Sequence, residues 1–451
     1  MSDSFIPPYP PRGAGPVAPW RGFFGERAKT AVYGWSERAF REWHLTRDVF
    51  GHTIHIPLHP DAVQRVLLDN AANYQKPKLV KQVLKPTIGH GLLSSDGELW
   101  RTQRKIVAAS FAPPAVDALV PVFADVAQRA ADHWQAGRRD MAASATEATM
   151  QVISQALFSG DARLTSREAM RHIGRALEAV SEARIQVILG LPLVPVTPRG
   201  WRGRAGQKYL RRTLGKVVRE RLEPGAPDDF VAGMTRALMQ QFPREQALDL
   251  AVDNAITFYL AGHETTANAI SWTLFILSRL AELQENVAAK ALQALSSGAD
   301  SQLPERLPLL RAIVGETLRL YPSAPRLDRE AVATDRLGDV DIAPGDIVSI
   351  WPWLIHRHTK LWDEPDSFDH TRFLGDPRKR WHRFQYIPFG AGPRTCVGAR
   401  FAMAEALTIL AVWLSEWRFQ PVEGWRVETS GMVTLRPKGG LPLILERRNS
   451  Q

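Results

Sequence analysis

A long run of apolar side chains at helical spacing constrains the fold of this chain more than any other feature. The run covers residues 244–283 and reads REQALDLAVDNAITFYLAGHETTANAISWTLFILSRLAEL. Its centre is almost wholly apolar, and a helix that is apolar on every side is buried. We therefore expect one long helix that crosses the interior. A second run of this kind, residues 116–137, predicts another helix.

Strand-like segments are short, and they lie toward the two ends of the chain. They read HTIHIPL at 52–58, DIVSIWPW at 346–353 and VTLRPKGGLPLIL at 433–445. We expect a mainly α fold with small β-sheets, in which a proline-rich lead over residues 1–20 precedes a single domain over residues 21–451. The arginine-rich loop 199–204, within LPLVPVTPRGWRGRAG at 191–206, is interpreted as a mobile lid between two helices.

Composition narrows the environment and the partners. The chain has 57 basic and 47 acidic residues, which gives a formal charge of +10. A basic excess of this kind is compatible with binding to nucleic acid, to a membrane surface or to an acidic protein, and it does not favour any one of these partners. No recognised nucleic-acid module is present, and no run reaches the length of a membrane span. One cysteine excludes a disulfide framework and suits a reducing compartment. We expect a cytoplasmic monomer with no membrane span and no nucleic-acid partner.

The single cysteine, Cys396, lies in the glycine-rich segment PFGAGPRTCVG, residues 388–398. A lone cysteine without context is more often a buried structural residue. Zinc would need about three further ligands, with no second cysteine to supply one. A haem iron needs a single thiolate, because the porphyrin supplies four nitrogens.

The neighbours of Cys396 suit the haem alternative. Gly390, Gly392 and Gly398 let the backbone approach a ring and turn N–H groups toward the sulfur. Phe389 is placed to shield the sulfur from water, and Arg394 is placed to meet a haem propionate.

The pattern Phe389-x-x-Gly392-x-Arg394-x-Cys396-x-Gly398 resembles the haem-binding loop of the cytochrome P-450 superfamily of haem-thiolate monooxygenases. The resemblance covers nearly the whole chain. It implies the P-450 fold, with haem b (iron protoporphyrin IX) between the long distal helix and the helix that follows the cysteine loop. It also implies that Cys396 is the metal ligand.

A second family signature is Glu316-x-x-Arg319 in GETLRLYP. Residues three apart on a helix share a face, so these side chains can pair. In the family, the pair joins a later arginine to lock the cysteine loop, and that arginine resembles Arg372 in FDHTRF. The usual Pro-Glu before it is replaced by His370-Thr371, which makes the geometry of that loop less certain.

A third signature, AGHETT at 261–266, lies inside the long helical run. Glycine and paired threonines are poor helix formers, so their place there suggests a functional distortion. The stretch resembles the family's oxygen-binding groove, which implies that Glu264 and Thr265 relay protons and that Ala261 faces the cofactor. HETTA also begins like a zinc-protease helix, but Ala267 stands where that motif needs histidine.

Three further basic or indole side chains resemble ligands of the haem propionates. Trp100 and Arg104, in GELWRTQRK, occupy positions that face the haem edge in the family, and Arg329 resembles another propionate ligand. Read singly, each arginine is equally well a surface residue.

The resemblance implies a monooxygenase that inserts one atom of O2 into a small hydrophobic substrate such as a fatty acid or terpenoid. No residues remain for a fused reductase, so electrons are expected from a ferredoxin or flavodoxin with its reductase. The alternatives are a peroxide-using or isomerising haem-thiolate enzyme and a haem-based ligand sensor. Positions that resemble the family's substrate pocket are Leu93, Leu260, Ala261, Ala324, Pro325, Arg326 and Val433. Arg326 either binds a substrate carboxylate or turns toward solvent.

Overall fold

The structure is a computed structural model. It describes residues 5–13, 30–49, 51–166, 168–176, 186, 197–376, 379–431 and 433–448. Two compact units are present. The first unit comprises Met1–Gln75, Asp117–Ala148 and Glu264–Gln451, and the second comprises Lys76–Val116 and Thr149–His263.

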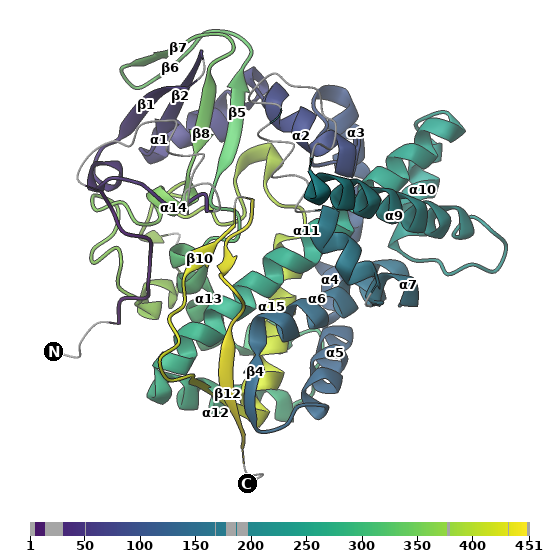
Figure 1. Cartoon of the computed structure of the whole chain (residues 1–451), viewed down its shortest axis with the longest axis vertical. Helices are drawn as coiled ribbons and strands as arrows, with labels where there is room; N and C mark the ends of the chain where they lie inside the picture. The colour runs from purple at the N-terminus through teal and green to yellow at the C-terminus, as the bar shows by residue number, and fades with distance from the viewer. Residues whose placement is uncertain are drawn as a thin grey trace. The chain divides into compact units, whose positions relative to one another are not determined.

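The described strands all belong to the first unit (Figure 1). One sheet has the order β1-β2-β8-β5-β3, and its strands are β1 (His44–Val49), β2 (His52–Pro57), β8 (Ile347–Ile350), β5 (Leu327–Ala331) and β3 (Tyr74–Gln75). A second sheet orders β4 (Gly137–Asp140), β12 (Pro442–Arg447) and β9 (Trp417–Pro421). Two small pairs complete the set: β6 (Asp335–Leu337) with β7 (Val340–Ile342), and β10 (Thr429–Ser430) with β11 (Arg436–Pro437). The predicted mainly α fold with small sheets is confirmed.

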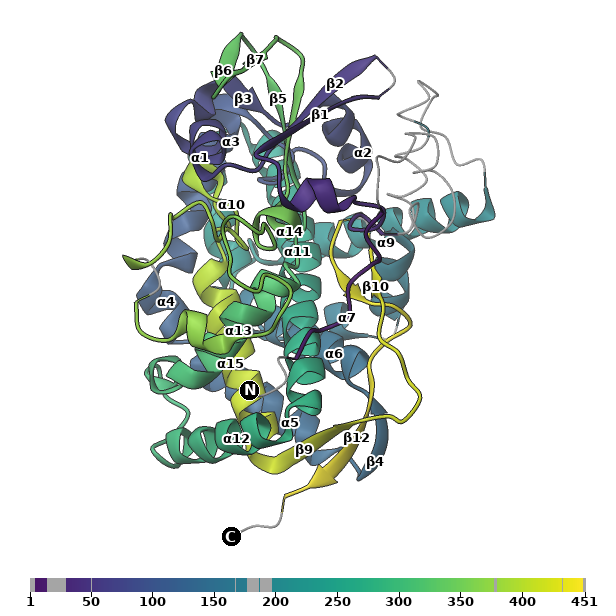
Figure 2. The same cartoon turned by 90° about the vertical axis from the view of Figure 1, so that its left-hand side faces the viewer.

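The helical core of the first unit centres on α15 (Ala399–Glu416), which runs among α5, α12 and α13 (Figure 2). Nearly every residue from Phe401 to Leu414 is buried, as expected for a helix that is apolar all round. Trp413 donates from its indole nitrogen to the carbonyl of Ala127 at 3.0 Å and so ties α15 to α5. The bounds of the first unit's other helices are α1 (Pro60–Gln64), η4 (Arg65–Asp69), α5 (Val120–Asp132), α12 (Ala281–Ser296), α13 (Pro308–Leu320) and α14 (Pro352–Ile355).

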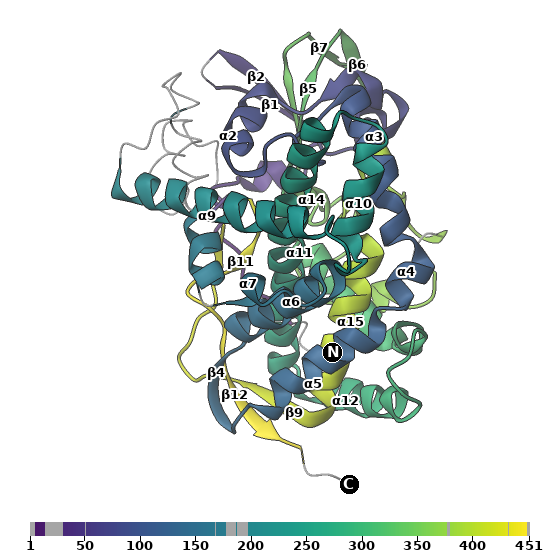
Figure 3. The same cartoon turned by 90° about the vertical axis from the view of Figure 1, so that its right-hand side faces the viewer.

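The second unit is helical in its described part (Figure 3). Its helices include α2 (Lys78–Ile88), α3 (Gly97–Ala108), α7 (Ala162–Thr165), α9 (Pro198–Glu220) and α10 (Phe230–Met239). Phe111, Phe230 and Phe258 form an aromatic cluster in its core, with ring centroids 5.1 to 5.7 Å apart. Three described helices begin in one unit and end in the other: α4 (Pro113–Asp117), α6 (Met141–Phe158) and α11 (Arg244–Arg279).

The long predicted helix exists, but it ends earlier than expected. α11 stops at Arg279 and α12 begins at Ala281, so the single helix predicted over 244–283 is wrong at its end. Leu280 leaves the helical conformation, with φ −123° and ψ 71°. The buried side chain of Gln284 donates to the carbonyls of Leu277 and Phe419, and these hydrogen bonds stabilise the break.

The arginine-rich loop prediction is also wrong for its described part. Residues 191–196 lie outside the described residues, whereas residues 198–206 form the first turns of α9. Thr197 caps this helix, because its hydroxyl accepts the N–H of Gly200 at 3.0 Å, and Pro198 occupies the first helical position. This Thr-Pro signal marks a helix start that the glycine and arginine content obscured.

The described residues of the proline-rich lead belong to the first unit and pack against its later segments. Phe368 donates its N–H to the carbonyl of Phe5 at 2.9 Å, and the hydroxyl of Tyr321 donates to the carbonyl of Pro8 at 2.6 Å. Arg12 pairs with Asp366 at 2.5 Å. The lead is therefore bound to the domain over residues 5–13.

Among the described residues, no single helix has the length and apolar composition needed to cross a membrane. One bent pair, Gly97–Phe111 with Pro113–Asp132, meets that requirement when its members are taken together.

Candidate active site

The cysteine loop, residues 388–398, is held in one conformation by its own backbone. The N–H of Cys396 donates to the carbonyl of Phe389 at 2.8 Å, and that of Thr395 donates to Gly392 at 3.1 Å. Gly390 and Gly392 have φ of +68° and +69°, a region that glycine adopts without strain. At Gly392 a Cβ would lie 1.7 Å from the carbonyl oxygen of Leu67 in η4, so no other residue fits there.

A buried ion-pair network lies behind this loop. One edge of the Arg319 guanidinium faces Glu316, with Nε and Nη2 each donating to a carboxylate oxygen at 2.7 Å. Both side chains are fully buried. Arg372 approaches the same carboxylate at 3.6 Å, so the structure brings the three predicted side chains together.

Arg319 also connects this network to the cysteine loop. Its Nη1 donates to the carbonyl of His356 at 2.7 Å, and the ring Nε2 of His356 accepts the N–H of Ile387 at 2.9 Å. Burial, together with the nearby charge of Arg319, lowers the pKa of His356 to about 3. The imidazole is therefore neutral at physiological pH, as an acceptor must be, and it anchors the chain just before the loop.

Replacing Arg319 with lysine is expected to destabilise the fold by about 3 to 5 kcal/mol, because a lysine cannot satisfy the buried carboxylate through a fork. Urea unfolding of the purified protein measures this loss. The matched control is Arg372→Lys, whose longer and partly exposed contact should cost less than about 1 kcal/mol. Equal losses in the two variants would contradict the central place of Arg319.

The motif in α11 coincides with an accessible interval in a buried helix. Residues 251–260 and 266–278 are buried throughout, whereas Ala261 is exposed and Gly262, Glu264 and Thr265 are half-buried. A Cβ on Gly262 would meet the Ile153 side chain at 2.6 Å, so this glycine permits close helix packing within the second unit. The accessible side chains at 264 and 265 belong to the first unit, as the cysteine loop does.

Glu264 and Thr265 have partners that lie far away in the sequence. Glu264 accepts a hydrogen bond from the hydroxyl of Thr434 at 2.7 Å, and Arg436 lies 3.5 Å from the same oxygen. Arg436 is 57% exposed, so the carboxylate is linked to the surface. The hydroxyl of Ser323 donates to the carbonyl of Thr265 at 2.9 Å. Sequence reasoning missed all three partners.

Within the first unit, the predicted cofactor residues Arg394 and Gly398 are half-buried in the cysteine loop. Arg329 is buried on β5, where its Nη1 donates to the carbonyl of Asp328 at 2.9 Å. Within the second unit, Trp100 and Arg104 are half-buried, one turn apart on the same face of α3. The structure thus supplies basic side chains in both units.

The predicted substrate residues are mostly apolar and partly accessible. Leu93 and Val433 are among the large apolar side chains that the described residues leave exposed. Leu260 and Pro325 are buried, and Ala324 is half-buried. Arg326 already has a carboxylate partner, because its Nε lies 3.0 Å from Asp328 and its guanidinium lies over the ring of Trp351.

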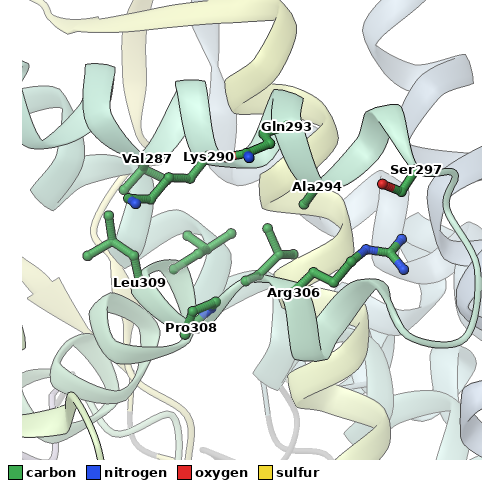
Figure 4. A pocket seen from close by; sticks show the side chains of 10 residues that line it. Val287, Lys290, Gln293, Ala294, Ser297, Arg306, Pro308 and Leu309 are labelled. Carbon is green, nitrogen blue, oxygen red and sulfur yellow. The ribbon is translucent and has the colours of Figure 1, made fainter.

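One cavity of about 320 Å³ opens beside α12 in the first unit (Figure 4). It is lined by Val287, Lys290, Gln293, Ala294, Ser297, Arg306, Leu307, Pro308, Leu309 and Leu310. None of the predicted cofactor, catalytic or substrate residues lines it. We therefore do not assign this cavity to the substrate.

These features fit a haem-thiolate protein, and comparison with known proteins shows the family. The family model described as Cytochrome P-450 matches residues 43–443, so the chain belongs to the cytochrome P-450 family. The protein is a cytochrome P-450 monooxygenase, and its cofactor is haem b.

Two relatives come from Streptomyces melanosporofaciens. Cyclooctatin synthase is 30% identical over 405 residues, covering 88% of this chain and 86% of the relative. Cyclooctat-9-en-7-ol 5-monooxygenase is 29% identical over 398 residues, covering 87% and 86%.

Two solved structures are similar as well. CYP175A1 from Thermus thermophilus shares 26% identity at a TM-score of 0.72, covering 90% of this chain and 92% of that one. The haem domain of cytochrome P-450DA has a TM-score of 0.80 at 20% identity, covers 98% of each chain, and supports the fold alone.

The residues of this structure fit the haem. The cysteine loop is accessible along its length, and the only thiol of the chain, in no disulfide, is exposed on it. The buried helix α15 begins just after this thiol in the sequence. The buried Glu316–Arg319 pair anchors the chain before the loop. A structural cysteine packed in a core would not be held at an exposed position by such a scaffold.

Proposed function

We propose that this enzyme inserts one oxygen atom of O2 into a small hydrophobic substrate, with electrons from a separate ferredoxin or flavodoxin and its reductase. Overall, substrate, O2, two electrons and two protons become hydroxylated product and water. The observation that carries the proposal is the exposed Cys396 on a loop anchored to the buried Glu316–Arg319 pair. The single cysteine supports a cytoplasmic location.

When bound, haem supplies the activation of dioxygen. We assign Cys396 as the residue whose thiolate would hold the haem iron and would donate electron density to it, with Phe389 and Gly398 beside it. Arg394, Arg329, Trp100 and Arg104 are assigned to the propionates. The hydroxyl of Thr265 holds a proton at its Oγ1, where it donates a hydrogen bond in the groove, and Ala261 faces the cofactor.

The protons come from solvent by way of Glu264. Its half-buried carboxylate faces the exposed Arg436. The hydroxyl of Thr434 donates a hydrogen bond to one of its oxygens. A carboxylate so placed can accept a proton from bulk water and pass it toward Thr265, its neighbour in α11.

We infer an apolar substrate from the side chains assigned to bind it. These side chains are Leu93, Leu260, Ala324, Pro325 and Val433. The name of one relative describes oxidation of cyclooctat-9-en-7-ol, which agrees with a hydrophobic molecule such as a terpenoid. Fatty acids have the same apolar character.

A panel of terpenoids and fatty acids tests this proposal. Binding is measured as the spectral change when a compound displaces water from the haem. Turnover is measured in separate arms, with ferredoxin or flavodoxin as the electron donor, or with hydrogen peroxide as the oxidant. We expect hydroxylated product with an electron donor and O2. Product with peroxide alone would favour a peroxide-using enzyme, and ligand binding without product in any arm would favour a sensor.

Replacing Arg326 with leucine is expected to change the relative affinity for an acid and its methyl ester by less than about threefold, because Asp328 already neutralises the guanidinium. Spectral titration of both compounds measures the ratio. Asp328→Asn is the matched variant, and it should increase affinity for the acid by freeing Arg326. A tenfold loss for the acid alone in Arg326→Leu, about 1.4 kcal/mol, would instead assign Arg326 to the substrate.

A further inference from the structure

The positive charge of this chain is concentrated in one of its two units. The whole chain has 57 basic and 47 acidic residues. The second unit contains 23 of the basic and 13 of the acidic residues, which leaves 34 of each in the first unit. The first unit is therefore neutral, and the formal charge of +10 belongs entirely to the second.

Most of this excess lies on a single helix of the second unit. The sequence of α9 contains eight basic residues and one acidic residue, Glu220, so its net charge is +7 within 23 residues. Glu220 pairs with Arg163, outside the helix, at 2.5 Å. Like charges three or four residues apart repel one another and destabilise a helix. An anionic partner would relieve this repulsion.

One face of α9 packs into the second unit, and the opposite face is basic. On the packed face, a Cβ on Gly206 would lie 2.5 Å from the carbonyl oxygen of His172, so the helix lies close to that segment. Among the described residues, the only basic side chain of α9 in an ion pair is Arg211, which pairs with Asp253. We define the basic face of α9 by five other exposed side chains: Arg202, Arg204, Lys208, Arg212 and Lys216.

A neighbouring helix adds positive charge beside α9. The side-chain amide of Gln207 donates to the hydroxyl of Thr87 at 2.8 Å and so joins α9 to the last turn of α2. The sequence of α2 contains Lys78, Lys81 and Lys85 and no acidic residue. The positive potential around α9 is therefore extended by α2 within the same unit.

An exposed indole lies at the start of the basic face. Trp201 is 62% exposed, which is the largest exposed fraction among the large apolar side chains described in the second unit. Lys208 and Arg212 follow it by seven and eleven residues, so the three side chains form one stripe along the helix. Tryptophan is enriched where a membrane meets water, because its ring is apolar and its N–H is a hydrogen-bond donor.

The packing of α9 determines how it could meet a bilayer. Its apolar side chains Leu210, Leu214 and Val217 are at most 2% exposed, so they are not available for insertion among acyl chains. The basic face could instead lie along the headgroups over the length of the helix, about 34 Å at 1.5 Å per residue. Attraction of lysine and arginine to anionic headgroups supplies the affinity in this mode.

The other anionic partners fit these observations less well. Contacts with nucleic acid phosphates give no role to an exposed indole beyond the last arginine, and the chain has no recognised nucleic-acid module. An acidic electron donor has to approach the cysteine loop, and Cys396 belongs to the neutral first unit.

We propose that α9 binds the surface of an anionic lipid bilayer, with its basic face on the phosphate headgroups and Trp201 at the interface. The second unit thereby attaches the protein to the membrane surface without a membrane-spanning segment. Membrane binding of this kind is independent of the proposed monooxygenase activity.

Co-sedimentation of the haem-loaded protein with lipid vesicles tests the proposal. Affinity for vesicles of phosphatidylcholine with phosphatidylglycerol should exceed affinity for phosphatidylcholine alone by about tenfold or more. The difference should shrink at high salt, because the Debye length falls from about 8 Å at physiological ionic strength to about 3 Å at 1 M. Equal affinity for the two kinds of vesicle would overturn the proposal.

A triple variant locates the binding surface on α9. Each cation near an anionic bilayer contributes about fivefold in affinity, so Lys208→Gln/Arg212→Gln/Lys216→Gln should weaken binding to the anionic vesicles by about tenfold or more. The matched control removes three exposed charges from the neutral unit, as Arg138→Gln/Lys290→Gln/Arg426→Gln. It should change the affinity by less than about threefold. Equal losses in the two triple variants would contradict a surface on α9.

A further variant separates a bilayer from nucleic acid. Trp201→Ser should weaken binding to the anionic vesicles by about threefold or more, since the interfacial contact of the indole is lost. Haem content and unfolding temperature should stay as in the wild type, because the side chain is exposed. Wild-type protein that binds a mixed-sequence DNA duplex more tightly than the anionic vesicles would assign the surface to nucleic acid and overturn the proposal. Protein that binds the vesicles but forms no product would count against the proposed function alone.

Discussion

The Cys396→Ser variant is expected to lose the strongly red-shifted Soret band that the ferrous–CO form of the wild type should show. That band requires that a thiolate hold the haem iron, and Cys396 is the only thiol in the chain. A serine hydroxyl is far less acidic and cannot take its place. The spectrum of the reduced, CO-saturated protein, measured beside haem content, gives the result directly.

The neighbouring threonine supplies the control for this variant. Thr395→Ser keeps the weak contact of the hydroxyl with the carbonyl of Phe389 and should keep the red-shifted band. Haem-loaded wild type that lacks the band would refute the thiolate assignment. A Cys396→Ser protein that retained the band would refute it equally.

Thr265→Ala is expected to lower product formed per reductant oxidised by roughly a hundredfold or more, and by less where reduced coupling limits the effect, because a positioned proton donor is lost. Reductant should still be consumed, and hydrogen peroxide should appear in place of product. Substrate affinity and haem binding should remain close to those of the wild type.

Thr273→Val is the matched control for this prediction. Thr273 is buried on the same helix, but its hydroxyl is satisfied by the carbonyl of Ala269 at 2.8 Å. This change should leave the ratio of product to peroxide unaltered. If Thr265→Ala instead lowers stability or haem content at unchanged coupling, Thr265 only shapes the helix and the peroxide-using and sensor alternatives regain support.

Features encoded by local spacing could be predicted from the sequence. The apolar period predicted the burial of α11, and spacing of three residues predicted that Glu316 and Arg319 share a face. The glycine pattern around Cys396 predicted a loop whose backbone can approach a ring, and the structure shows a close approach of Gly392 to the carbonyl of Leu67 instead. In each case the physical reason lies within a few residues.

Features that depend on distant residues could not be predicted in this way. The end of α11 depends on Gln284 binding the carbonyls of Leu277 and Phe419, and no glycine or proline marks it. Glu264 finds Thr434 and Arg436 at a separation of 170 residues or more.

Glu405, a fully buried residue of α15, was overlooked for a related reason. A single glutamate in an apolar helix appears solvent-facing until its complete burial is seen. The start of α9 is a different case, because Thr197 and Pro198 form a local helix-start signal from which it could have been predicted.

Isotope labelling shows whether this enzyme places one oxygen atom of O2 into its substrate. The wild-type enzyme is supplied with an electron donor, a compound that binds and heavy-oxygen O2, and the product is analysed by mass spectrometry. We expect one heavy oxygen atom in each molecule of product. Product whose new oxygen comes from water or from added peroxide, with none from O2, would contradict it.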